Sequence, residues 1–421
     1  MIGASYLEHK LNERGKLHGK RGKKMLQLVT ATVTGVVEQR EGMQILSVQV
    51  EGSQHIEQAI SFGEESYSLG DHLLVNTTAV RLQLGTGGFH LVVGKENTMR
   101  ERDVAPSEWG HIMKMRYAPW QLAVDTVEEQ NSPYHELFSR EDLSLEGTPV
   151  VISELHSMLP VTVQAIKEKN AEEQIVYVMP DGASLPLALS RHVHHLRKTE
   201  KLAATVTAGH AWGGDYEAVT IHSALLAAKH IESATIIVCM LGPGVAGTGT
   251  SYGFSGVQLA EVIHAVSALG GIPFYIPRIS FSDLRNRHYG LSHHTSVVLG
   301  RYALRPVVLS IPRLGDHRDF HLEQQVSALC KQNEHGVVWG SVASLDRLNA
   351  LEETYGLSFS TMGRSWKEDP VPFQTAILAA DHVLRFRTWL QESFTCDPYW
   401  FSAPNILAEI SLFLTKSEEP L

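Results

Sequence analysis

The chain lacks any apolar run of about 18 residues, the length that a membrane-spanning helix needs, and we therefore expect no membrane partner. Cysteine is scarce: three residues occur in 421, and none forms a Cys-x-x-Cys pair. This scarcity argues against a disulfide framework and a cysteine-ligated metal site, and it favours a reducing, cytoplasmic location. Positive charge is in deficit, because the formal net charge is −10, which argues against a nucleic-acid partner.

What the chain does contain is the composition of an ordinary folded protein, with 43% hydrophobic residues, and a high count of 22 histidines. A length of 421 residues accommodates two or three domains. The histidines raise the expectation of acid–base or metal chemistry, although their number also dilutes the meaning of any single one.

The amino-terminal part of the sequence predicts a basic tail followed by a small β domain. Residues 1–24 are rich in Lys and Arg, and no apolar segment follows them, so they predict a flexible tail and not a secretory signal. From 25 to 94, five short runs of Val, Ile and Thr, separated by turn residues, predict an all-β barrel of the OB or SH3-like kind. The polar residues 95–109 are expected to form a linker, and residues 415–421 a loose tail.

Residues 110–414 predict an α/β domain, because β-branched runs alternate with segments of helical period. Such alternation is typical of a doubly wound, mostly parallel sheet of the Rossmann-like kind, with helices on both faces. The predicted strands are 150–153, 175–179, 203–207, 234–240, 273–276, 306–311 and 336–339. The predicted helices are 159–169, 184–198, 216–229, 257–269, 293–302, 319–331, 344–355 and 373–394.

A glycine-rich stretch at 241–256 lies between a predicted strand and a predicted helix, the arrangement in which backbone N–H groups converge on an anion. Its Gly-x-Gly-x-x-Gly spacing matches the dinucleotide fingerprint formally. However, the glycines continue to Gly256, and the acidic residue expected after the next strand to hold a ribose is missing. We therefore predict an anion or phosphate cradle, with a nicotinamide site or a tight structural connection as the alternatives, and the sequence leaves the cofactor unknown. The predicted ligand-binding residues are Gly242, Gly244, Gly247, Thr248, Gly249 and Thr250.

The loop after the strand at 273–276 holds a cluster of arginines. Arg278, Arg285 and Arg287 offer fork-shaped donors that fit a carboxylate or a phosphate. Because the carboxyl ends of parallel strands share one edge of a sheet, these arginines are expected beside the glycine-rich stretch. Pairing with surface acids is the alternative. The hypothesis predicts that Arg278→Ala weakens ligand binding without unfolding the protein.

Two histidine clusters are candidates for proton transfer. His210 precedes Asp215 and Glu217, although Asp215 also suits the cap of the next predicted helix. His288 lies near Asp283 in the arginine loop. His210 or His288 would transfer the proton, assisted by Asp215 or Asp283.

A metal site in the arginine loop is weighed but not assigned. His288, His293 and His294 lack the His-x-x-x-His and His-Glu-x-x-His spacings, and adjacent His293 and His294 are expected to point apart on a helix. His293 is therefore placed among the ligand-binding residues.

Several blocks of sequence resemble a bacterial family of unknown function, the DUF3866 family, over about residues 25–314. They are Gly110-His-Ile-Met-Lys-Met-Arg-Tyr117, Ala208-Gly-His210, Gly244-x-x-Gly-Thr-Gly-Thr250 and Pro277-Arg-Ile-Ser280. The resemblance implies a bacterial, cytoplasmic, two-domain protein and brings no established reaction.

The function favoured by these patterns is that of an enzyme acting on a small anionic ligand, a nucleotide or a phosphorylated metabolite. A non-catalytic ligand-binding sensor and a metal-dependent hydrolase are the alternatives, and the sequence leaves both enzymatic activity and homo-oligomerisation open.

Overall fold

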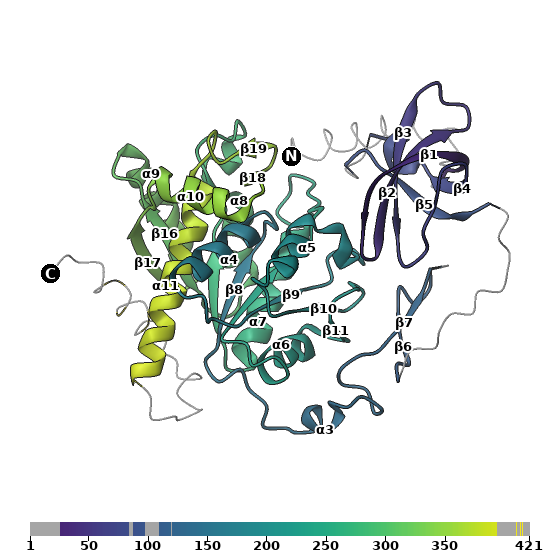
Figure 1. The fold of residues 1–421 in the computed structure, drawn as a ribbon. Coiled ribbons are helices and arrows are strands. Elements are labelled where there is room, and N and C mark those ends of the chain that lie inside the picture. Colours follow the sequence, from purple (N-terminus) through teal and green to yellow (C-terminus); the bar gives the residue numbers. More distant parts are fainter. Residues whose placement is uncertain are drawn as a thin grey trace, which may run out of the picture. The chain divides into compact units, whose positions relative to one another are not determined.

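The structure is a computed structural model that describes residues 26–83, 87–96, 109–118 and 120–393, together with Ile410, Phe413 and Thr415. The chain divides into two compact units, Met1–Arg102 and Asp103–Leu421 (Figure 1). The predicted basic tail at 1–24, most of the linker predicted at 95–109 and nearly all of the predicted tail at 415–421 lie outside the described residues.

The first unit contains a closed five-stranded barrel, which confirms the all-β prediction. The strand order is β1-β2-β3-β5-β4, and β1 closes the barrel by antiparallel pairing with β4. Alternate residues such as Val33, Val48 and Val75 point into the core, as the period of a half-buried strand requires. The elements are β1 (Leu28–Arg40), β2 (Met43–Val50), β3 (Ile56–Phe62), β4 (His72–Asn76), α2 (Thr78–Arg81) and β5 (His90–Lys95).

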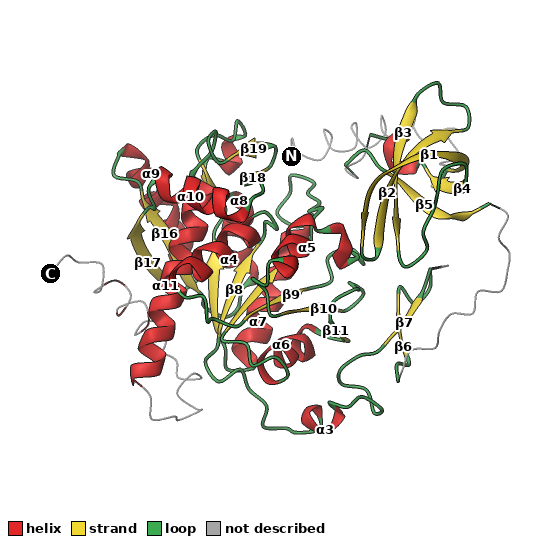
Figure 2. Ribbon diagram, viewed as in Figure 1, coloured by secondary structure: helices red, strands yellow, loops and turns green. Residues whose placement is uncertain are grey.

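The second unit is built on an eight-stranded sheet in which every pair of neighbours is parallel (Figure 2). This arrangement confirms the α/β prediction. The strands are β8 (Pro149–Ser153), β9 (Ile175–Met179), β10 (Ala204–Ala208), β11 (Tyr216–Ala218), β12 (Ile236–Met240), β13 (Ile272–Ile276), β16 (Val308–Arg313) and β17 (Gly336–Ser341).

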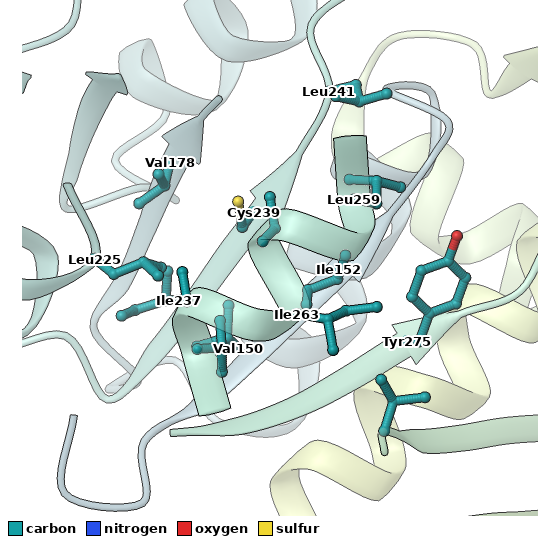
Figure 3. Packing of buried hydrophobic residues seen from close by; sticks show 14 of the residues in the cluster. Val150, Ile152, Val178, Leu225, Ile237, Cys239, Leu241, Leu259, Ile263 and Tyr275 are labelled. Atoms are coloured by element: carbon teal, nitrogen blue, oxygen red, sulfur yellow. The ribbon is translucent and has the colours of Figure 1, made fainter. Parts of the chain in front are cut away.

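Helices cover both faces of this sheet, because successive strand residues point to opposite sides and both sides are apolar. Val150, Ile152 and Cys239 belong to one core, packed against Leu259 and Ile263 of α7 (Figure 3). The first core lies under α6 (Ile221–His230), α7 (Leu259–Ala268) and α9 (His317–Cys330). The second lies under α4 (Met158–Lys169), α5 (Arg191–Lys198), α10 (Leu345–Tyr355) and α11 (Val371–Ser393).

The prediction of a helix at 216–229 is wrong for the first residues of this segment. Tyr216 pairs with Val206 of β10, so the first residues of that segment form the edge strand β11. The helix α6 begins only after Thr220, whose side chain accepts a hydrogen bond from the Ser223 amide at 3.2 Å. Asp215 therefore does not cap it. A strand of three residues leaves too little pattern to be recognised in the sequence.

The direction of the connections reverses at the centre of the sheet. The order is β11-β10-β9-β12-β8-β13-β16-β17, so β12 and β13 flank β8. The chain leaves β8 toward β9 on one side, and it leaves the neighbouring β13 toward β16 on the other. In open parallel sheets, ligands characteristically bind beyond the carboxyl ends of the strands at such a reversal.

The remaining short elements of the second unit lie mostly in its loops. They are β6 (Ile112–Lys114), β7 (Leu122–Val124), α3 (His135–Phe138), β14 (Ile279–Ser280), β15 (Gly290–Leu291), α8 (His293–Val297), a π-helical turn at Val298–Tyr302, β18 (Ser360–Thr361), β19 (Arg364–Ser365) and three 3-10 turns at Leu187–Leu189, Ser255–Gln258 and Asn286–His288. Among the helices that the structure describes, none combines the length and the hydropathy that a membrane crossing would need.

Candidate functional site

A short hairpin folds the loop after β13 back over the carboxyl end of the sheet. β14 and β15 pair antiparallel, with Ser280 opposite Gly290. The Ser292 amide donates to the Arg278 carbonyl at 2.9 Å, and the Arg278 amide donates to the Thr295 hydroxyl at 3.1 Å. These bonds bring the start of the loop next to its end, so that its arginines and histidines gather in one place.

Three histidines come together at the end of this loop. The nitrogen atoms that His288, His293 and His294 could offer to a metal all lie within 4.8 Å of one another. The expectation that His293 and His294 point apart is wrong, because their ring centroids are 4.5 Å apart. Side-chain torsions in the first turn of α8 bring the two rings together, and helical spacing alone does not predict them.

Glu154, at the end of β8, holds one of these histidines. The Nδ1 atom of His294 lies 2.8 Å from Oε1 of Glu154, whose side chain is 2% exposed. Its other oxygen, Oε2, is buried and has no hydrogen-bond partner within the part of the chain that the structure describes. Glu154 is not among the site residues predicted from the sequence. The available signal was a charged side chain directly after a fully buried strand.

Two of the three predicted arginines form ion pairs with acidic side chains. The buried guanidinium of Arg278 lies between Glu154 and Asp283, 3.4 Å from each carboxylate. Arg285 donates two side-chain hydrogen bonds to Asp283, at 2.9 and 2.8 Å. The hydrogen bond from Arg285 holds the pKa of Asp283 far below its ordinary value, despite burial. Asp283 is thus placed as a counter-ion and not as a proton acceptor.

Arg287 has no acidic partner among the residues described in the structure. Its Nε atom donates to Nε2 of His288 at 3.2 Å, and the residue is exposed. A Cβ atom added at Gly249 would lie 2.8 Å from its Nη1 atom, so the guanidinium lies directly over the glycine-rich stretch. Arg287 and Gly249 therefore lie next to each other, as we expected because their loops leave the same edge of the sheet.

The glycine-rich stretch is exposed from Gly244 to Thr250 and forms a small hairpin of its own. The Thr248 amide donates to the Gly253 carbonyl at 2.8 Å, and the Thr248 and Thr250 hydroxyls contact each other at 3.0 Å. These groups are used inside the hairpin. The amides of Gly244, Gly247 and Gly249 have no hydrogen-bond partner among the described residues.

Gly242 has a packing role in the structure. A Cβ atom there would lie 2.9 Å from side-chain atoms of both Leu185 and Met179, so a larger residue would have to displace these two side chains. The residue is buried, unlike the exposed glycines that follow it.

The two best-placed histidines are neutral at physiological pH. Burial, followed by the charges of Arg278 and Arg285, lowers the pKa of His288 to about 3. Burial, followed by the charges of His294 and Arg287, also lowers the pKa of His293. Neutral imidazoles have a lone pair free for a proton or a metal ion.

The His210 group is a separate, structural network. Nδ1 of His210 accepts a hydrogen bond from the Met115 amide at 3.0 Å. Asp215 accepts from Arg197 and from the Thr205 amide and hydroxyl, at 2.8 and 2.7 Å for the latter two. Among the described residues, no hydrogen bond or ion pair joins His210 to Asp215.

Glu217 completes this network around a buried lysine. Lys114 donates to Glu217 at 2.5 Å, to the Ala211 carbonyl at 2.6 Å and to the Thr207 carbonyl at 3.1 Å. Burial lowers the pKa of Lys114, although the charge of Glu217 opposes that shift. The fully satisfied lysine joins β6 to the end of β10.

The fold and this site together define an α/β protein with a β-barrel unit and a cluster of His and Arg at the carboxyl edge of its sheet. The chain belongs to the family described as "Protein of unknown function (DUF3866)", whose model matches residues 59–380. No curated protein matches the chain.

Proposed function

We propose that the protein is an enzyme that binds a small anionic ligand, a nucleotide or a phosphorylated metabolite, between Arg287 and the glycine-rich stretch. One observation carries the proposal: Arg287 is exposed, lacks an acidic partner among the described residues and lies over Gly249. A guanidinium without a counter-ion binds a phosphate or carboxylate through charge-assisted hydrogen bonds.

The backbone beside Arg287 supports the same ligand. Gly244 and Gly249 adopt φ values of 98° and 76°, a left-handed region that favours glycine. Their N–H groups, with that of Gly247, are free to bind anion oxygens. The doubly wound, Rossmann-like interpretation fits this position, because such sheets bind ligands where their connections diverge.

Replacing Arg287 with Ala is expected to weaken anion binding about tenfold to a hundredfold, since a hydrogen bond to a charged group contributes about 1.5–3 kcal/mol. Inorganic phosphate, pyrophosphate and ATP are screened by thermal shift, and the tightest is titrated calorimetrically. The control is Arg140→Ala, which removes an exposed arginine paired with Asp142 at 2.9 Å before β8. Equal affinity of Arg287→Ala and the native protein would exclude Arg287 from the site.

Gly249→Ala tests the glycine side of the site. Its Cβ would meet Nη1 of Arg287 at 2.8 Å and push the guanidinium aside, so we expect anion affinity to fall. The positive φ adds about 1–2 kcal/mol of backbone strain. Gly315→Ala is the matched control, because its φ is 79° and nothing lies within 4 Å of the added Cβ. Equal affinities for the two variants would show that the contact between Arg287 and Gly249 does not contribute to anion binding.

A further inference from the structure

We propose that His288, His293 and His294 bind one divalent transition-metal ion of the zinc type. This inference goes beyond the proposed function, because the ion would bind with no anion present. Imidazole nitrogen is a preferred ligand of Zn²⁺, and three protein ligands with an open position are typical of catalytic zinc sites. The three candidate nitrogen atoms lie within 4.8 Å of one another, so small side-chain movements would bring them around one ion.

The second ring nitrogens of two of these histidines are held by neighbours, as in known metal sites. Nδ1 of His294 lies 2.8 Å from Glu154, and Nδ1 of His288 lies 2.8 Å from the Ser292 hydroxyl. A metal-ligating histidine characteristically donates its other N–H to a carboxylate or another oxygen, which fixes the ring and its tautomer. His294 therefore leaves Nε2 for the ion, whereas Nε2 of His288 is the acceptor of the Arg287 hydrogen bond.

The third histidine presents a nitrogen that lacks any other use. Nε2 of His293 is buried, with no hydrogen-bond partner in the described part of the chain. An unsatisfied buried polar atom costs about 1–3 kcal/mol. A metal ion shared with His288 and His294 satisfies this atom.

The glycine-rich stretch shapes the space next to these nitrogens. A Cβ atom at Gly247 would lie 3.9 Å from Nε2 of His294, so the glycine leaves room beside the candidate ligand atom. Phe254 stacks on the His294 ring at 4.1 Å between centroids, which holds the ring from one side. The proposed anion site and the proposed metal site thus both lie next to the glycine-rich stretch.

The contacts and charges near the cluster show that Arg287 would compete with the ion for one histidine nitrogen. Arg278 and Arg285 are balanced by Glu154 and Asp283, as their contacts show. Arg287 has no acidic partner in the described ranges, and it donates at 3.2 Å to Nε2 of His288, the atom that would bind the metal. Metal binding must displace this hydrogen bond, and it would release the guanidinium toward an anion. A metal ion and an arginine side by side would polarise a phosphoryl or carbonyl oxygen that binds between them.

The test uses the full chain, without a histidine tag, stripped of metal by a chelator and titrated with ZnCl₂. We expect one tight equivalent by elemental analysis after gel filtration, and Co²⁺ to give the strong visible absorption of a four- or five-coordinate site. His293→Ala should weaken Zn²⁺ binding about tenfold or more, by analogy with the 10–100-fold cost of disturbing metal-site residues. The control is His222→Ala, an exposed histidine on α6, which should retain the native affinity.

His293 is chosen because it is only half-buried, whereas His288 is 1% exposed and its loss could impair folding. The absence of a tight equivalent in native protein, or equal Zn²⁺ affinity in folded His293→Ala, would overturn the proposal. Arg287→Ala separates the two proposals, because it should weaken anion binding and strengthen Zn²⁺ binding; weaker Zn²⁺ binding would refute the competition. Native protein that binds Zn²⁺ but no anion refutes only the proposed function, and the reverse result refutes only the metal site.

Discussion

Replacing Lys114 with Ala should destabilise the second unit by about 3–5 kcal/mol, the usual cost of removing one partner from a buried ion pair. Lys114 is 1% exposed and donates to Glu217 and to two backbone carbonyls. Without the ammonium group, both carbonyls lose this donor and Glu217 loses its counter-ion, although its carboxylate keeps hydrogen bonds from the Thr207 hydroxyl and the Gly213 amide. The loss is measured by urea unfolding followed through tryptophan fluorescence, since all seven Trp of the chain lie within 103–421.

The control for this prediction is Lys229→Ala. Lys229 pairs with the exposed Glu146 at 3.1 Å, and such surface pairs contribute about 0–1 kcal/mol. In the double variant with Glu217→Gln, part of the lost stability should return, because no charge remains unpaired. A loss of less than about 1 kcal/mol for Lys114→Ala would contradict the account of this buried network.

The sequence predicted the layers of the fold because those depend on local pattern. Runs such as 234–240 are β-branched, lie between helical segments and belong to buried parallel strands, as the structure confirms for β12. Strand order depends on long-range packing instead. The position of β12 between β9 and β8 is set by pairs such as Ile237 with Val150, which are distant in the chain.

For the candidate site, too, the sequence predicted what depends on neighbouring residues and not what depends on distant ones. Because Arg287, His288 and His293 follow one strand, the sequence placed them together at one edge. It could not show which arginine lacks an acid, since the partner of Arg278 and His294 is Glu154, more than a hundred residues away. Nor could it show that Lys114 is buried, because its partners lie on β10, β11 and the loop between them.

The structure also changes what is expected of Arg278→Ala. The sequence predicted weaker ligand binding in a folded protein, but Arg278 is 7% exposed and balances the buried Glu154. Asp283 retains Arg285 at 2.8 Å after the substitution, whereas Glu154 retains only the imidazole of His294 as a partner among the described residues. We therefore expect a loss of about 3–5 kcal/mol in the same fluorescence experiment.

Glu154→Gln in the Arg278→Ala background provides the decisive comparison. If the unpaired carboxylate causes the instability, removing its charge should restore part of the lost free energy, with a coupling of about 0.5–3 kcal/mol between the two positions. Additive effects would show that Arg278 and Glu154 act independently. Arg278→Lys should retain part of the stability, because it keeps the charge but loses the fork that contacts Glu154 and Asp283 together.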